Sequence, residues 1–489
     1  MTLDLVITRA AGAVIATTAA AWGLVPRMKS LPLALVTLAL LAGCSASLPK
    51  IDADKLPPTP QSFREGGSFT VAAPADAQPR GEWWKAFSDP VLDELIGRAD
   101  RGNTSIRVAA ARLTQARAFV RATDAARMPQ IDAGAGAQRA GGIVNGIGGP
   151  ARSLFSAGVD LSYEVDLFGR LRQASDAARL DAQASEGLLQ SARLLVQAEV
   201  AQTYLALRAI DTERALVRST VVAYRDTLAL TERRWRAGDV AELDVARART
   251  EVAATESDAL ALDRRRAELE HALAVLVGEV ASTFVIPADQ WNTLLPAVPA
   301  GVPSTVLTRR PDISAAQNSL VAAQTRVGVA KAAWFPSFAL TASGGYASTD
   351  LSDLFKWSSR AWGIGVLGAL PIFDGGRRNA GIQSAGAEFD IALERYREQV
   401  LVAFQDVEDQ LAARALLEEQ AEAQERAVAS ASRSTALSEV RYRNGYVSQL
   451  DLLDAQRSEL RNRRQALQVR SAQYQSSVAL VRALGGGWN

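Results

Sequence analysis

The chain repeats itself at a spacing of 207 residues. The dipeptide at 128–129 (MP) returns at 335–336 (FP), and the pentapeptide at 234–238 (RWRAG) returns at 441–445 (RYRNG). A duplication of this length predicts two copies of one unit, each ordered as helix, two extended segments, long helix, tight turn and long helix. The 489 residues are therefore expected to form one duplicated fold rather than several unrelated domains.

The charged and reactive residues exclude several classes of function. Basic and acidic residues number 54 and 53 and are interspersed, so no basic face predicts a nucleic-acid partner. One Cys and one His cannot make a Cys/His zinc cluster, a disulfide framework or a Ser-His-Asp triad. The His, His271, lies in a helical stretch and is expected to be an ordinary surface residue. We expect no catalytic residue, no metal site and no cofactor.

The N-terminal region has the pattern of a secretion signal. An apolar run of 13 residues, 31–43, follows Met28 and Lys29 and precedes Cys44. A membrane-spanning helix needs about 20 residues, so the run predicts a cleaved signal peptide over 1–43, with Met28 as the true start. The sequence at 41–44 (LAGC) resembles the bacterial lipobox, in which the Cys is acylated and becomes the new N-terminus. The alternative is a free Cys buried at the end of a short membrane helix.

Two long stretches are built from helix-forming residues. No Pro occurs within 151–286 or after Pro371, and Ala, Leu, Gln, Glu and Arg dominate there. In the range 171–236 only Gly187 interrupts, which predicts a helix of about 100 Å. Helices of ordinary globular domains are much shorter.

The apolar residues of these stretches follow a coiled-coil pattern. Between Val196 and Leu228 they recur at spacings of four and three, with one interruption at Arg214. So long a helix needs a packing partner in water. Gly238 and Gly445 are therefore expected to turn the chain and pair each long helix with an antiparallel neighbour. The result would be two long hairpins, one per repeat.

Extended segments come in pairs before each long helix. They are Gly-rich, and their apolar residues alternate with small or polar ones, which predicts strands with one face in lipid and one wet. The segments are 130–137, 154–168, 337–346 and 361–373. Strands of a soluble β-sandwich would alternate in the same way. Four strands cannot close a membrane barrel, because the smallest have about eight, so three copies would have to share one of about twelve.

Several motifs together resemble a known family. They are Trp83-Trp84 with Phe87 and Asp89-Pro90, LTRRPDI at 307–313, RYRNG at 441–445, and ALGGGW at 483–488. With these the chain resembles the TolC-like outer-membrane efflux channels, in their lipoprotein branch. The resemblance implies a mainly α fold with membrane β-strands, in which a trimer builds a 12-stranded β-barrel, an α-helical barrel and an equatorial belt.

Domain boundaries follow from this comparison. We expect a signal peptide (1–43), a lipidated tether (44–85), a first channel repeat (86–280), an equatorial linker (281–303), a second repeat (304–485) and a C-terminal tail (486–489).

The resemblance also implies function and partners. A homotrimer would give passive exit to drugs, toxic small molecules or metal ions delivered by an inner-membrane pump of the RND type and a periplasmic adaptor. The chain would be no enzyme, and Cys44 would be its attachment to outer-membrane lipid. An alternative is an outlet for type I protein secretion with the same architecture. A periplasmic adaptor lipoprotein would carry one hairpin beside a lipoyl-like sandwich, and an anchored cell-wall enzyme would need a compact catalytic domain.

The family places a gate at the periplasmic tips of the hairpins. Two aspartates after the second turn ring the constriction in the family, and Asp451 and Asp454 match these positions. Tyr442 and Asp244 match a tyrosine and an aspartate that tie the two hairpins of a subunit together. Where some members complete this tie with an arginine, this chain has Val447.

Two arginines of the second turn, Arg441 and Arg443, are candidates for the role that Val447 cannot fill. A local interpretation competes for the acidic residues: Ser448 and Asp451 fit a capping box, and Asp239 with Glu242 offers the same cap in the first hairpin.

Overall fold

The computed structural model describes residues 49–52, 54, 56–60, 62–66, 81–144, 147–289, 291–296 and 309–486. All of them belong to one compact unit, Leu48–Asn489. The expected signal peptide, Cys44 and the end of the C-terminal tail lie outside the described residues.

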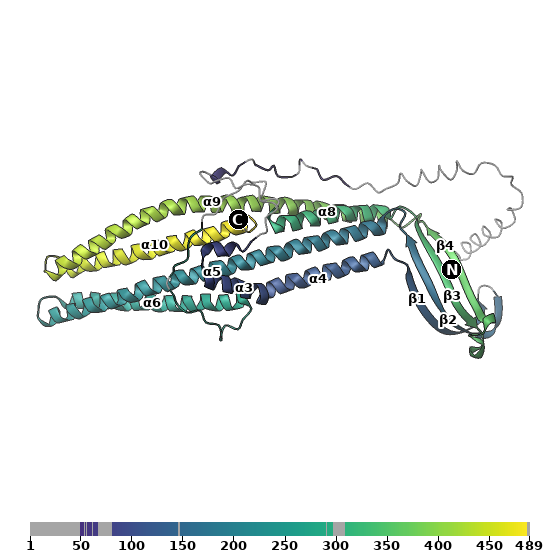
Figure 1. The fold of residues 1–489 in the computed structure, drawn as a ribbon, viewed down its shortest axis with the longest axis horizontal. Helices are drawn as coiled ribbons and strands as arrows, with labels where there is room; N and C mark the ends of the chain where they lie inside the picture. The colour runs from purple at the N-terminus through teal and green to yellow at the C-terminus, as the bar shows by residue number, and fades with distance from the viewer. Residues whose placement is uncertain are drawn as a thin grey trace. The chain divides into compact units, whose positions relative to one another are not determined.

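The predicted duplication is confirmed, and the same spacing relates the helices of the two repeats (Figure 1). Each helix of the first repeat has a counterpart that starts 207 residues later. The pairs are α4 (Thr104–Ala125) with α8 (Pro311–Ala332), α5 (Arg170–Arg236) with α9 (Arg377–Arg443), and α6 (Glu242–Val277) with α10 (Gln449–Ala483). The helices α5 and α9 have 67 residues each, as the lack of Pro predicted.

Glycine ends both long helices in the same way. Gly238 and Gly445 have φ values of 84° and 75°, a left-handed conformation that costs glycine little. The Asp239 N–H donates to the Arg234 carbonyl and the Tyr446 N–H to the Arg441 carbonyl, both at 2.9 Å. These bonds satisfy carbonyls that a helix end leaves free. The chain then returns as α6 and α10, so each repeat forms one antiparallel hairpin.

Four antiparallel strands form one sheet in the order β1-β2-β3-β4. Their bounds are β1 (Gln130–Val144), β2 (Ile147–Val165), β3 (Ser337–Ser348) and β4 (Arg360–Ala369). The first two are longer than predicted because ladder bonds offset the low strand propensity of their glycines. The last ends before the predicted Phe373, since Pro371 has no N–H to continue the ladder.

The register gives the sheet one apolar and one polar face. Val159 and Leu161 of β2 stand opposite Gly344 and Ala342 of β3, and Leu340 stands opposite Val366 of β4. Cross-strand partners lie on the same face of a sheet, so this face is largely apolar. The other face carries residues such as Ser162, Thr341, Ser343, Gly363 and Gly365, again in register.

A different property concerns the helices. Within the described ranges, none is both long enough and apolar enough to cross a membrane.

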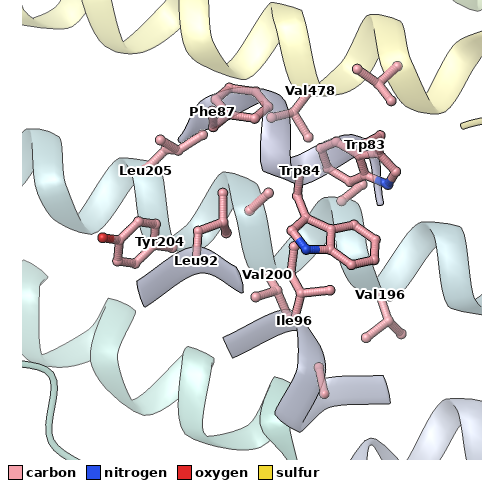
Figure 2. Packing of buried hydrophobic residues seen from close by; sticks show 14 of the residues in the cluster. Trp83, Trp84, Phe87, Leu92, Ile96, Val196, Val200, Tyr204, Leu205 and Val478 are labelled. Atoms are coloured by element: carbon pink, nitrogen blue, oxygen red, sulfur yellow. The ribbon is translucent and has the colours of Figure 1, made fainter. Parts of the chain in front are cut away.

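The helical core lies where α3 (Pro90–Gly102) crosses α5 near the end of α10 (Figure 2). A short 3-10 helix, η3 (Trp83–Phe87), inserts three buried aromatic residues there. The rings of Trp83 and Trp84 meet edge to face with centroids 5.9 Å apart. The expected aromatic motif is therefore a packing element that fixes α3 on α5, because aromatic side chains bury large apolar areas.

Candidate gate at the hairpin tips

Two of the quoted motifs meet at the base of the second hairpin. The buried guanidinium of Arg310, just before α8, donates to Asp312 at 2.7 Å, to Asp406 of α9 at 2.9 Å and to the Ala483 carbonyl at 3.2 Å. Gly485 has a φ of 88°, and a Cβ there would lie 2.8 Å from the Arg309 carbonyl. Only glycine allows so close an approach. Residues 307–308 and 487–488 of these motifs lie outside the described residues.

Asp89 joins the first helix to the described part of the linker. Its carboxylate caps α3 by accepting from the backbone N–H groups of Val91 and Leu92. It also accepts from the Tyr204 hydroxyl at 2.8 Å and from the Thr293 hydroxyl at 2.9 Å. The sequence showed the cap, but the two hydroxyl donors come from distant segments and carried no local signal.

The interruption of the seam at Arg214 is part of a charge cluster. Asp211 is buried and accepts from Arg214 at 3.1 Å and from Arg266 of α6 at 2.7 Å, and it pairs with Arg208 at 3.4 Å. Arg214 also pairs with Asp263 of α6 at 2.6 Å. Paired charges avoid the large penalty of an isolated buried ion, so this break in the apolar pattern links α5 to α6.

At the tip of the second hairpin, Asp451 closes a capping box. The Asp451 N–H donates to Ser448 Oγ at 3.3 Å, and the Ser448 N–H donates to Asp451 Oδ2 at 3.0 Å. The Ser448 hydroxyl donates to the same carboxylate at 2.7 Å. These hydrogen bonds, and then the charge of Arg441, lower the pKa of Asp451. The local capping interpretation is therefore satisfied for this residue.

Asp454 lies one turn further along α10 and takes no part in the cap. Its side chain is 62% exposed, and its carboxylate lies 3.3 Å from Nη1 of Arg457. It is thus the more accessible of the two aspartates.

The first hairpin begins its second helix differently from the prediction. The N-cap of α6 is Ala241, with no side-chain hydrogen bond, so Asp239 is not a cap. Asp244 lies in the first turn of α6, 3.7 Å from Arg247. An acidic residue in a first turn is stabilised by the helix dipole.

The expected hydrogen bond between Tyr442 and Asp244 does not form. The Tyr442 side chain is buried, and its hydroxyl has no hydrogen-bond partner in the described part of the chain. Instead the Arg234 guanidinium of the first hairpin lies 4.7 Å from the centre of the Tyr442 ring. It also donates to the carbonyls of Tyr442 and Arg443 at 3.5 and 3.4 Å.

The two arginines proposed to complete the tie have other positions. Arg443 pairs with Glu439 on its own helix, and Arg441 acts on Asp451 through its charge. Arg234, in the RWRAG motif of the other repeat, contacts the opposite hairpin in their place. Its position 207 residues before Arg441 was visible in the sequence, but not the side to which it points.

The acidic residues near the tips do not form a metal site in this chain. Across the described ranges, no group of three or more His, Cys, Asp or Glu side chains could hold a metal ion.

Comparison with known proteins agrees with this architecture. The family model described as outer membrane efflux protein matches twice, at residues 95–279 and 302–486. The toluene efflux pump outer membrane protein TtgI of Pseudomonas putida is 34% identical, covering 95% of this chain and 99% of its own. The cation efflux system protein CusC of Escherichia coli is also 34% identical, covering 92% and 96%.

Solved structures show the same fold. The outer-membrane channel OprN superimposes with a TM-score of 0.83 at 30% identity and covers 91% of this chain and 99% of its own. Similarity therefore extends through both repeats and includes the sheet and the hairpins. This chain belongs to the outer membrane efflux protein family.

Proposed function

We propose that three copies of this chain form one outer-membrane channel for the passive exit of substrates. The observation that carries the proposal is the sheet. Its apolar face is exposed in the single chain, with Trp362, Ile364 and Val366 between 68% and 82% exposed. Its edge strands β1 and β4 each have a neighbour on one side only within the described part of the chain. Joining copies edge to edge satisfies both edges and leaves the apolar face toward lipid.

The partners follow from the position of an outlet. We infer that a periplasmic adaptor and an inner-membrane pump of the RND type deliver the substrate, and that this chain supplies a passage without catalysis. The relatives are named for toluene and for cations, which supports a pump that selects and an outlet that conducts. We propose that Cys44, outside the described residues, is acylated and attaches each copy to the membrane.

The gate is proposed at the tips, with Asp454 as its main carboxylate and Asp451 beside it. Three copies would bring six carboxylates to one constriction, where their fields attract cations. Asp454 is exposed and outside the cap, which supports its assignment. Asp451 has a structural duty already, so its contribution to the pore field is secondary.

Recordings in planar bilayers test this function. Purified protein should be trimeric by native mass measurement and should form cation-selective channels that divalent ions block from the periplasmic side. Asp451→Ala with Asp454→Ala should weaken both properties, because the ring loses its acceptor oxygens. Asp390→Asn is the matched control, since this exposed carboxylate lies on α9 far from the tip. A monomer without channel activity would overturn the proposed function, whereas unchanged selectivity in the double variant would move the gate elsewhere.

A further inference from the structure

Two arginines of α10 reach from the second hairpin to the first. Arg457 forms a close ion pair with Glu251 of α6. Arg464 lies 2.8 Å from Asp258 of α6 and 2.7 Å from Glu213 of α5. Sequence analysis had singled out none of these five residues.

The spacing of these pairs is regular. Arg457 and Arg464 are seven residues apart on α10, and Glu251 and Asp258 are seven apart on α6. Both helices run away from their own turns, so they are parallel where they meet. Residues seven apart lie on nearly the same face of a helix, and the two pairs therefore form successive rungs between α6 and α10.

The carboxylates of the rungs are shielded from solvent. The side chains of Glu251 and Glu213 are 13% and 9% exposed, while the arginines are 40% and 30% exposed. Burial gives a carboxylate little water to replace a lost partner, so removing the arginine leaves an uncompensated charge. The hydroxyl of Tyr224, on α5 beside the first rung, is buried without a hydrogen-bond partner in the described ranges and offers no replacement.

Apolar packing between the hairpins is weak at this level. A groove of about 380 Å³ lies between α5, α9 and α10, lined by residues that include Leu216, Tyr224, Tyr442 and Leu460. Within each hairpin, by contrast, other contacts hold the helices together, such as Arg225 with Glu256 in the first. The ion pairs therefore bridge a gap that side chains do not fill.

We propose that Arg457 and Arg464, with Glu251, Asp258 and Glu213, form an ionic ladder that holds the two hairpins of one chain in the arrangement seen here and so keeps the gate shut. The inference rests on the proposed channel function. Arg457 also contacts Asp454 at 3.3 Å, so the first rung connects the proposed gate carboxylate to the opposite hairpin. An opening that separates the hairpins must break both rungs.

The ladder can be tested in the same bilayer recordings with the full trimer. Arg457→Gln with Arg464→Gln should raise the open probability about tenfold, because contacts are lost only from the shut arrangement. Arg461→Gln is the control, since this exposed arginine lies between the two on α10 and pairs with no described residue. Arg457→Lys keeps a positive charge and should stay close to the wild type.

Charge reversal separates a specific pair from a general effect of charge. Glu251→Arg alone should open the channel, and adding Arg457→Glu should restore closure by re-forming the pair in the opposite sense. Circular dichroism and native mass measurement verify that each variant is a folded trimer. If folded trimers of the ladder variants keep wild-type open probability, or if the reversed pair fails to restore closure, the ladder is wrong.

The outcomes also distinguish this inference from the proposed function. A wild-type trimer that forms no channel contradicts the function itself. A conducting wild type whose selectivity depends on Asp454, but whose opening is indifferent to Arg457 and Arg464, keeps the function and removes the ladder.

Discussion

At the scale of single residues, Tyr442 shows how one side chain can offer two different contacts. Its resemblance to the family's tying tyrosine directed attention to the hydroxyl, yet the ring is what contacts the first hairpin. A guanidinium over an aromatic face is attracted by the ring's negative centre, and this attraction needs no hydroxyl. The buried hydroxyl, without a partner in the described part of the chain, contributes an unsatisfied group instead.

We therefore expect Tyr442→Phe to leave the stability and the conductance of the trimer nearly unchanged. Arg234→Gln should cost about 1 kcal/mol by removing the cation–π contact and should raise conductance. Thermal unfolding and bilayer recordings on the two variants check this difference. Loss of closure in Tyr442→Phe equal to that in Arg234→Gln would show that the hydroxyl acquires a partner in the assembled trimer.

At the scale of secondary-structure elements, Gly187 is explained by the approach of a second helix. It is the one glycine within α5, and a Cβ there would lie 2.9 Å from the Pro311 carbonyl and 3.1 Å from the Ala315 methyl group. Glycine lowers helix propensity by about 1 kcal/mol relative to alanine. The cost is offset by close packing of α8 against α5, which a side chain at this position would block.

Gly187→Ala should therefore lower the temperature of trimer unfolding, although alanine favours a helix. Gly386→Ala is the matched control on α9, because a Cβ there meets no atom within 4 Å. The control should raise stability by up to about 1 kcal/mol per chain through helix propensity alone. Differential scanning calorimetry on both variants measures the contrast, and stabilisation by both would mean that α8 moves aside without cost.

At the scale of the whole molecule, the repeat makes a statement about how copies join. Ala133 pairs with Val159 in the first hairpin of the sheet and Leu340 with Val366 in the second, so the spacing of 207 residues holds in the register. Val159 of β2 pairs with Gly344 of β3 across the junction of the two repeats. If copies join as the repeats do, Val366 of one chain stands opposite Ala137 of the next.

This register can be tested by cross-linking. Val366→Cys with Ala137→Cys should form disulfides between chains on oxidation and give a covalent trimer on a denaturing gel, because directly opposed strand residues are close enough to bridge. Val366→Cys with Gly136→Cys should not, since a shift of one residue moves the side chain to the other face. Efficient cross-linking of the second pair, and not of the first, would contradict the proposed register.

Local and periodic features could be predicted from the sequence because they depend on neighbours along the chain. The spacing of 207 residues, the length of α5 and the capping box of Ser448 and Asp451 all follow from propensity, turn chemistry or hydrogen bonds within one turn. The beginnings of β1 and β3 followed from alternation after Pro129 and Pro336. The family itself was visible in motifs that combine such local signals.

Only the tertiary structure decided which distant groups meet. Whether Arg234 or Arg441 contacts the opposite hairpin depends on how the hairpins are rotated about each other, and equivalent positions in two repeats have the same local sequence pattern. Arg214 looked like a fault in an apolar seam until Asp211 and Asp263 were found beside it. Propensity and periodicity describe a chain's own neighbours, whereas a salt bridge between hairpins depends on packing that brings residues some 200 positions apart into contact.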